Sequence, residues 1–391
     1  MVIEEVAYHF EVAADGQAVT YLVRAAQQAE ELLAYAHATE LYSRALAAHR
    51  TYLDDELAGQ FELLLAREAV LDRQGRRAEQ ANDVAALVAV AETLGDPARL
   101  AVAYKRQVGF FTYTHRYEEA QRVGEQTLAL YRARGDRAGE AQALRELGFL
   151  HWSTSDYGTA LIYGREALQL NRSLGDVSAE ASALHNLAEI YRSLGSPRQA
   201  LELYEQALNL HWARKDQRRQ GLTLYGMAHA LRLGGNPQGA LARYQQALTH
   251  CEASGDRLMV SRTHQALASI QWEISSPDQV LEHLHKALGI SREIGYGPGI
   301  AHGLIALGYF HAQRGERDTA RQHFEEAMTW LRLTEDQVGL IEAQTQLNAL
   351  EKEAFTSIPL PATMGWVKSH LALAEGKVYC EFESPMAQHR L

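Results

Sequence analysis

Histidine and carboxylate side chains at helical spacing are the first candidates for chemistry in this chain of 391 residues. His185 and Glu189 are four residues apart, and Tyr225 and His229 repeat that spacing forty residues later. Residues four apart lie on one face of a helix, so two ring nitrogens and one carboxylate could hold a metal ion with an open position. A chelating motif usually brings a third ligand at close spacing, and none stands out. Hydrogen bonding is therefore the favoured role of these residues, and a metal-binding or small-molecule-binding enzyme is the alternative.

Nucleophilic catalysis finds no support in the sequence. No Ser/His/Asp or Cys/His grouping carries a nucleophile signature. Cys251 falls near the end of a helical segment, away from the helix N-terminus that would activate a thiol. We therefore expect no catalytic residue, no metal and no cofactor, and a protein that is not an enzyme.

The elements that must position these residues follow a repeat of forty residues. One grid carries the pairs Gly95-Asp96, Gly135-Asp136, Gly175-Asp176 and Gly255-Asp256, with Lys215-Asp216 in the gap. A second grid, offset by half a period, carries turn residues at 195–197, 235–237 and 275–277, with Gly75 and Gly315 at either end. Glycine supplies the left-handed residue that ends a helix, and Asp, Ser or Asn caps the next one. Turns every twenty residues therefore predict paired helices.

Between the turns, apolar residues recur at the spacing of a helix. Residues Leu184, Leu187, Ala188 and Tyr191 fall at i, i+3, i+4 and i+7, and the segment 200–208 repeats the pattern. This order of leucine, small residue, aromatic and alanine resembles the tetratricopeptide repeat, in a form with a longer second helix. The likeness covers roughly residues 19 to 353, about eight helix pairs and a final single helix. It implies an all-α fold, a right-handed superhelical solenoid of antiparallel helix pairs.

The first repeat carries a narrower resemblance. Residues 7–10 (AYHF), 18–26 (AVTYLVRAA) and 38–46 (ATELYSRAL) are similar to the opening of the helical-repeat arm that follows the ATPase domain in MalT-like and LuxR-type bacterial signal-transduction ATPases. This resemblance implies a sensor or scaffold arm in bacterial signalling or transcription control. The GxxxxGK[ST] phosphate loop and a basic helix-turn-helix do not occur in the sequence. The chain is thus either a separate arm or a relative by repeat ancestry only.

In the tetratricopeptide fold, the first helix of each pair lines a concave groove, and the groove residues are those outside the packing stripe. By this register the groove residues, here called the inner-face set, are Lys105, Arg145, Trp152, His185, Glu189, Arg192, Tyr225, His229, Arg232, Arg262, Trp272, His302 and Tyr309, with Phe149 beside them. Arginine pairs with carboxylates through two parallel bonds, and aromatic rings supply rigid contact area. The predicted partner is therefore a protein or acidic peptide, or an anionic small molecule. In the alternative, Arg145, Arg192 and Arg232 pair with carboxylates such as Glu146 and Glu189 and leave a solvated face.

Composition limits the partners and the location. The 38 Lys and Arg against 49 Asp and Glu give a net charge of −11, which disfavours nucleic-acid binding by this chain alone. Two cysteines are too few for a disulfide framework, and the first residues form neither a basic leader nor a long apolar run. These features predict a cytoplasmic protein without membrane contact, and they leave oligomer formation open.

The last residues do not follow the repeat. We expect residues 1–353 to form the solenoid and residues 354–391 to form a separate tail, because prolines at 359 and 361 prevent a helix from continuing. The segment 377–383 alternates apolar and polar residues after a Glu-Gly turn, which predicts a β-hairpin. An isolated hairpin is marginal in water, so it is expected to pack on the last repeats.

Overall fold

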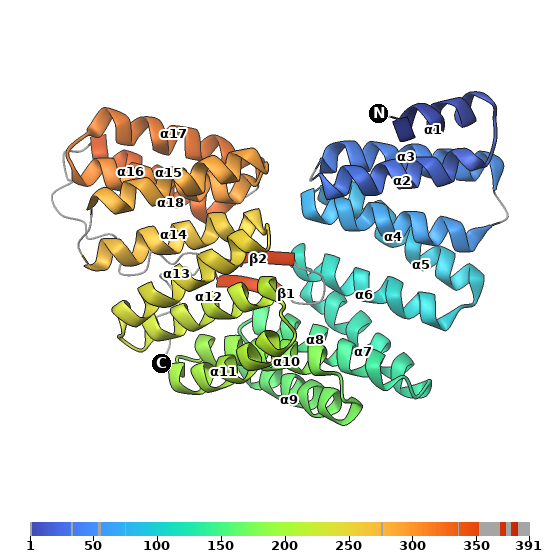
Figure 1. Ribbon diagram of the computed structural model, residues 1–391, viewed down its shortest axis with the longest axis horizontal. Coiled ribbons are helices and arrows are strands. Elements are labelled where there is room, and N and C mark those ends of the chain that lie inside the picture. Colours follow the sequence, from blue (N-terminus) through green and yellow to red (C-terminus); the bar gives the residue numbers. More distant parts are fainter. Residues whose placement is uncertain are drawn as a thin grey trace. The chain divides into compact units, whose positions relative to one another are not determined.

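The structure, a computed structural model, divides into two compact units, Met1–Gly175 and Asp176–Leu391 (Figure 1). It describes residues 2–32, 34–53, 56–74, 76–274, 277–334, 336–351, 368–372 and 377–381. Eighteen helices account for nearly all of these described residues. None of these helices is long and apolar enough to cross a membrane.

The first unit is a stack of helix pairs preceded by one further helix. Its helices are α1 (Val2–Val12), α2 (Gln17–Glu31), α3 (Tyr35–Tyr52), α4 (Leu57–Gln74), α5 (Arg77–Leu94), α6 (Pro97–Tyr113), α7 (Tyr117–Ala133), α8 (Arg137–Ser153) and α9 (Tyr157–Leu174). The pairs are α2 with α3, α4 with α5, α6 with α7, and α8 with α9, and each pair packs on the next. The additional helix α1 packs on α2.

The second unit continues the same pattern. Its helices are α10 (Val177–Ser193), α11 (Pro197–Ala213), α12 (Gln217–Leu233), α13 (Pro237–Ala253), α14 (Arg257–Ile274), α15 (Pro277–Glu293), α16 (Gly297–Gln313), α17 (Arg317–Leu333) and α18 (Gln337–Glu351). Four pairs run from α10 to α17, and α18 packs on α17. The two units together hold the eight helix pairs and the final single helix that the sequence predicts. The even-numbered helices from α2 onward are the first helices of the pairs, and the odd-numbered ones are the second helices.

Left-handed residues end the helices, as the two grids predict. Glycines at 95, 135, 175 and 255 have φ between +60° and +69°, and Lys215 takes the same conformation at φ +56°. The half-period grid also includes His115 at φ +57° and Ser155 at φ +63°. These two turns escape a search for glycine, because a residue with a β-carbon occupies a conformation that favours glycine. The predicted turn residues Gly75, Ser275 and Ser276 lie outside the described residues.

Capping side chains start the helices. The Asp136 Oδ1 atom accepts the backbone N–H of Gly139 at 2.8 Å, and Asp176 Oδ1 accepts those of Ser178 and Ala179 at 3.0 and 2.9 Å. These bonds satisfy donors that the first turn of a helix leaves unpaired. Ser196 was also expected to cap its helix, but its side chain makes no such bond.

The predicted packing stripe forms the core. Leu184, Leu187 and Ala188 are at most 2% exposed, and the facing residues Ala200 and Tyr204 on α11 are fully buried. Small residues let the paired helices approach closely. A β-carbon added to Gly308 on α16 would lie 2.6 Å from Phe324 Cε1 on α17, so this crossing has no room for one.

Two short strands lie beyond the helices. Strands β1 (Lys368–Ala372) and β2 (Lys377–Glu381) pair antiparallel, with Ser369 opposite Cys380. The second strand falls within the predicted segment 377–383. The predicted turn residues Glu375 and Gly376, and the rest of 352–367, 373–376 and 382–391, lie outside the described residues. The boundary at 353, and the packing of the hairpin on the last repeats, stay predictions.

Candidate binding site

The forty-residue repeat returns each inner-face position to an equivalent first helix. In the second unit these helices are α10, α12, α14 and α16, and in the first unit the inner-face set lies on α6 and α8. The inner-face side chains are mostly buried or half-buried. The function of the site therefore depends mainly on the hydrogen bonds and ion pairs of these side chains, because little of their surface is exposed to solvent.

Glu189 is the centre of a buried polar group between α10 and α11. Its Oε2 atom accepts Arg192 Nη2 at 2.8 Å and Nε at 3.1 Å, and its Oε1 atom accepts the hydroxyl of Tyr204. Burial by itself would raise the pKa of the Glu189 carboxyl, but the charge of Arg192 and the hydrogen bonds from Tyr204 and Arg192 hold that pKa below its usual value. Glu189 is therefore a carboxylate at neutral pH with both oxygens engaged.

His185 is a neutral hydrogen-bonding residue. Its side chain is 1% exposed, and its Nδ1 atom lies 3.2 Å from the hydroxyl of Thr223 on α12. Burial lowers the pKa of His185 to about 4. The Nε2 atom is 3.8 Å from Glu189 Oε1, too far for a hydrogen bond.

Next to this group, α12 and α13 bring together His229, Tyr225 and Tyr244. The ring centroid of His229 is 4.7 Å from that of Tyr225 and 5.3 Å from that of Tyr244. Tyr244 is fully buried. Among the described residues, neither the Tyr244 hydroxyl nor His229 Nε2 has a hydrogen-bond partner.

Three arginines from three successive first helices act on His229. Burial lowers the pKa of His229 well below its usual value, and Arg192, Arg232 and Arg262 lower it further. Arg262 is 4% exposed, and its guanidinium stands 5.7 Å from the centroid of the Tyr225 ring. We call Arg192, Arg232, Arg262, His229 and Tyr244 the arginine cluster.

Carboxylates partly neutralise the arginines. Arg192 pairs with Glu189 on α10, and Arg232 pairs with Glu273 of the next first helix, α14. In the first unit, Arg145 Nη2 donates to Glu146 Oε1 at 3.0 Å. The pairs of Arg145 and Arg192 are those that the alternative interpretation of the sequence expected.

The remaining inner-face residues of the second unit form separate contacts. The Trp272 ring packs edge-on against Phe310 at 5.5 Å. His302 Nε2 lies 3.7 Å from Asp336 Oδ2, and burial lowers the pKa of His302 to about 3. The Tyr309 hydroxyl donates to Glu342 Oε1 at 3.1 Å.

In the first unit, the inner-face set is also packed. Lys105 and Glu146 line one small cavity. Trp152 is 5% exposed and its ring lies 5.8 Å from that of Phe149. The sequence interpretation placed Trp152 and Trp272 on an open face. Instead Trp152 is buried and Trp272 is half-buried against Phe310.

The metal-binding alternative finds no ligand set in the described part of the chain. There, no three His, Cys, Asp or Glu side chains are grouped to hold a metal ion, so His185, Glu189 and His229 do not form one site.

Sequence reasoning missed three residues of the site, two of them on second helices. Tyr204, Tyr244 and Glu273 complete the polar contacts, yet none belongs to the inner-face set. The tyrosines recur forty residues apart at one position, and Tyr204 had been assigned to the packing stripe alone. This recurrence is the sequence signal that could have marked the two tyrosines.

Comparisons with known proteins agree with this architecture. The tetratricopeptide repeat family model matches residues 99–173, 163–211 and 219–293. A comparison with curated proteins finds no match.

Solved structures with a similar fold include three proteins of low sequence identity. A Pyrococcus horikoshii signal transduction ATPase with numerous domains and a tetratricopeptide repeat sensor has a TM-score of 0.56 and 14% identity, over 87% of this chain and 52% of that chain. A Rap protein complexed with competence and sporulation factor has a TM-score of 0.54 and 11% identity, over 86% and 98%. The Rap conjugation gene regulator of plasmid pLS20, in complex with the Phr* peptide, has a TM-score of 0.54 and 15% identity, over 71% and 74%. Since the identities are low, these likenesses concern the fold alone, an all-α solenoid of helix pairs. The family model shows that the chain contains tetratricopeptide repeats.

Proposed function

We propose that this protein is a non-catalytic binding module whose arginine cluster takes an anionic group of a peptide or protein partner. The main observation behind this proposal concerns two buried polar groups, His229 Nε2 and the Tyr244 hydroxyl. Both lack a hydrogen-bond partner among the described residues, and both lie beside three arginines. A buried polar group without a partner costs about 1–3 kcal/mol. A ligand group that enters between α12 and α13 and supplies an acceptor would remove that cost.

The chemistry of the cluster favours a carboxylate. A tyrosine hydroxyl donates a hydrogen bond, and the pKa of Tyr244 is raised by burial, so the donor is retained at neutral pH. Arg232 pairs with Glu273 through Nη2 alone, which leaves other N–H groups for a second acceptor. Arginine binds carboxylates through two bonds more effectively than lysine does. An acidic side chain or a chain terminus of a peptide fits these groups.

The similar structures support a role in sensing. Two of them were solved with a peptide or factor bound, and one carries its tetratricopeptide repeats as a sensor. By analogy, the present chain serves as a sensor or scaffold arm in bacterial signalling or transcription control. Fold analogy alone does not select a partner.

The proposal can be tested with a synthetic peptide array. The full chain, labelled with a fluorophore, is applied to acidic and charge-neutral peptides, and the affinity of the strongest peptide is then measured by calorimetry. Arg232→Ala is expected to weaken that affinity about tenfold, because a charged hydrogen bond is lost. The matched control is Arg198→Ala on the exposed side of α11, which should leave the affinity within about twofold. Equal effects of the two substitutions, or no preference for acidic peptides, would contradict the proposal.

A further inference from the structure

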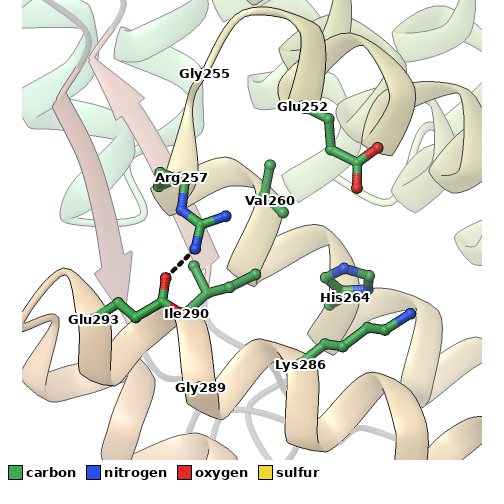
Figure 2. Close-up of a pocket in the computed structure, with 9 residues that line it drawn as sticks. All are labelled: Glu252, Gly255, Arg257, Val260, His264, Lys286, Gly289, Ile290 and Glu293. Atoms are coloured by element: carbon green, nitrogen blue, oxygen red, sulfur yellow. Dashed lines mark hydrogen bonds and ion pairs between the residues drawn. The ribbon is translucent and has the colours of Figure 1, made fainter.

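One repeat of the second unit contains a pocket that lies apart from the arginine cluster. The pocket has a volume of about 360 Å³ and lies between the end of α13, the first half of α14, and α15 (Figure 2). Volumes near 300 Å³ and above are typical of small-molecule sites. Because the chain is a repeat, the equivalent positions of its other repeats show what is unusual here.

The first unusual residue is His264 in the wall of the pocket. The equivalent positions on α8, α10, α12 and α16 hold Leu144, Leu184, Leu224 and Leu304, all at most 2% exposed. His264 is similarly buried, at 4%, so a polar ring replaces a core leucine. Its Nδ1 atom hydrogen-bonds with Nδ1 of His283 at 2.8 Å. The tautomer in which His264 Nδ1 accepts leaves Nε2 as a hydrogen-bond donor.

The facing helix α15 is unusual at two positions. Lys286 stands where the second helices of other repeats have Gln126, Glu166, Gln206, Gln246 and Glu326. Gly289 stands where they have Ala129, Gln169, Asn209, Thr249 and Thr329. A β-carbon built on Gly289 would meet no atom within 4 Å, so the missing side chain leaves open space at the pocket.

The fourth change is a reversal of charge across the pocket. In two other repeats, an arginine near the end of one second helix pairs with a glutamate on the next, as in Arg132 with Glu166 and Arg292 with Glu326. The equivalent residues here are Glu252 and Lys286. Lys286 donates instead to Glu282 on its own helix at 2.6 Å. The ion pair that joins the second helices in those two repeats is therefore missing here, and the pocket lies in its place.

From these four changes we propose that the pocket binds a small organic anion with a carboxylate or phosphate group. Lys286, Arg257 and His264 hold the oxygens, and Val260 and Ile290 contact the apolar part (Figure 2). This site is independent of the arginine cluster and of the proposed peptide partner.

The cations keep donors for such a ligand. Arg257 donates to Glu293 through Nη2 alone, which leaves the other guanidinium N–H groups. Lys286 likewise has further N–H groups beyond the bond to Glu282. Glu252 is exposed at the rim, where water screens its repulsion of an anion.

Calorimetric titration of the full chain tests this inference with three probes: inorganic phosphate, hexanoate and uncharged hexanol. Hexanoate is expected to bind one site saturably, phosphate more weakly because it lacks an apolar part, and hexanol not at all. Saturable binding of either anion supports the site, and phosphate binding without hexanoate binding assigns it to phosphates. Hexanol binding as strong as that of hexanoate contradicts an anion site.

Substitutions taken from the other repeats locate the site. Gly289→Gln and Lys286→Gln each introduce a residue that stands at the equivalent position of a folded repeat, so both variants should fold, which circular dichroism verifies. Gly289→Gln should abolish binding by filling the space, and Lys286→Gln should weaken it about tenfold. Arg243→Gln on α13 changes the charge equally outside the pocket and should have no effect. Absence of saturable binding by both anions, or binding that Gly289→Gln leaves unchanged, overturns the inference.

Discussion

At the scale of single residues, Glu189 illustrates how the fold stabilises a buried charge. Arg192 and Tyr204 occupy its two oxygens, and the side chain is only 12% exposed. The sequence indicated the pairing with Arg192 as an alternative, because the two residues are three apart on one helix. The contribution of Tyr204 could not be predicted in this way, since it depends on how α10 and α11 cross.

Replacing this carboxylate should destabilise the protein. Glu189→Gln leaves the Arg192 guanidinium buried without its charged partner, so the free energy of unfolding should fall by about 2–4 kcal/mol. Urea denaturation measures the change. Glu202→Gln removes an exposed carboxylate from α11 and should change the stability by less than about 0.5 kcal/mol. A similar small change for both variants would mean that Glu189 is solvated rather than buried.

At the scale of helices and turns, the glycine grid predicted most helix ends correctly. It could not predict the turns at His115 and Ser155, because the left-handed conformation there carries a side chain. These positions are set by the period of the fold rather than by local preference. The turn at Lys215 was inferred from its place on the grid. Lys215 also holds a side chain in the left-handed conformation, which costs free energy of folding.

The cost can be measured by exchanging residues between equivalent turns. Lys215→Gly should stabilise the protein by about 1 kcal/mol, since glycine adopts the left-handed conformation without strain. Gly255→Ala, at φ +69°, should destabilise it by a similar amount. Urea denaturation of both variants should give opposite signs. If both substitutions changed the free energy of unfolding in the same direction, the backbone at Lys215 would not be strained.

Close helix crossings supply a second test at this scale. Gly308→Ala should destabilise the protein by about 1–3 kcal/mol, because the new β-carbon would overlap Phe324. At the equivalent position on α8, the nearest atom to a β-carbon on Gly148 would be Tyr163 Cβ, at an ordinary 3.5 Å. Gly148→Ala should therefore stabilise its helix by up to about 1 kcal/mol. The thermal unfolding temperature should fall for Gly308→Ala and rise for Gly148→Ala. A rise for Gly308→Ala would contradict the close approach of α16 and α17 at Phe324.

At the scale of the whole molecule, the period of forty residues predicted the fold, but not which residues meet. Helix pairs follow from spacing alone, whereas the arginine cluster combines three first helices with Tyr244 of a second helix. The burial of Trp152 escaped prediction for the same reason. His264, by contrast, could have been noticed in the sequence, because four other repeats have leucine at the equivalent position.

Buried neutral histidines should make the second unit sensitive to acid. Burial lowers the pKa of His185 and His211 from 6.5 to about 4, and that of His302 to about 3. As pH falls below 6.5, the unfolded chain takes up protons that the folded chain does not, so the free energy of unfolding decreases down to about pH 4. Between pH 7 and 5, His302→Gln should lose about 1–2 kcal/mol less stability than the unchanged protein. Equal losses in urea denaturation would contradict this origin.

Hydrogen exchange of the full chain, with and without the strongest acidic peptide from the array, tests the proposed function most directly. If the peptide binds the arginine cluster, amide exchange should slow most in α10, α12 and α14, and the slowing should disappear with Arg232→Ala. Slowing confined to the first unit or to α11 and α15 would contradict binding at the arginine cluster.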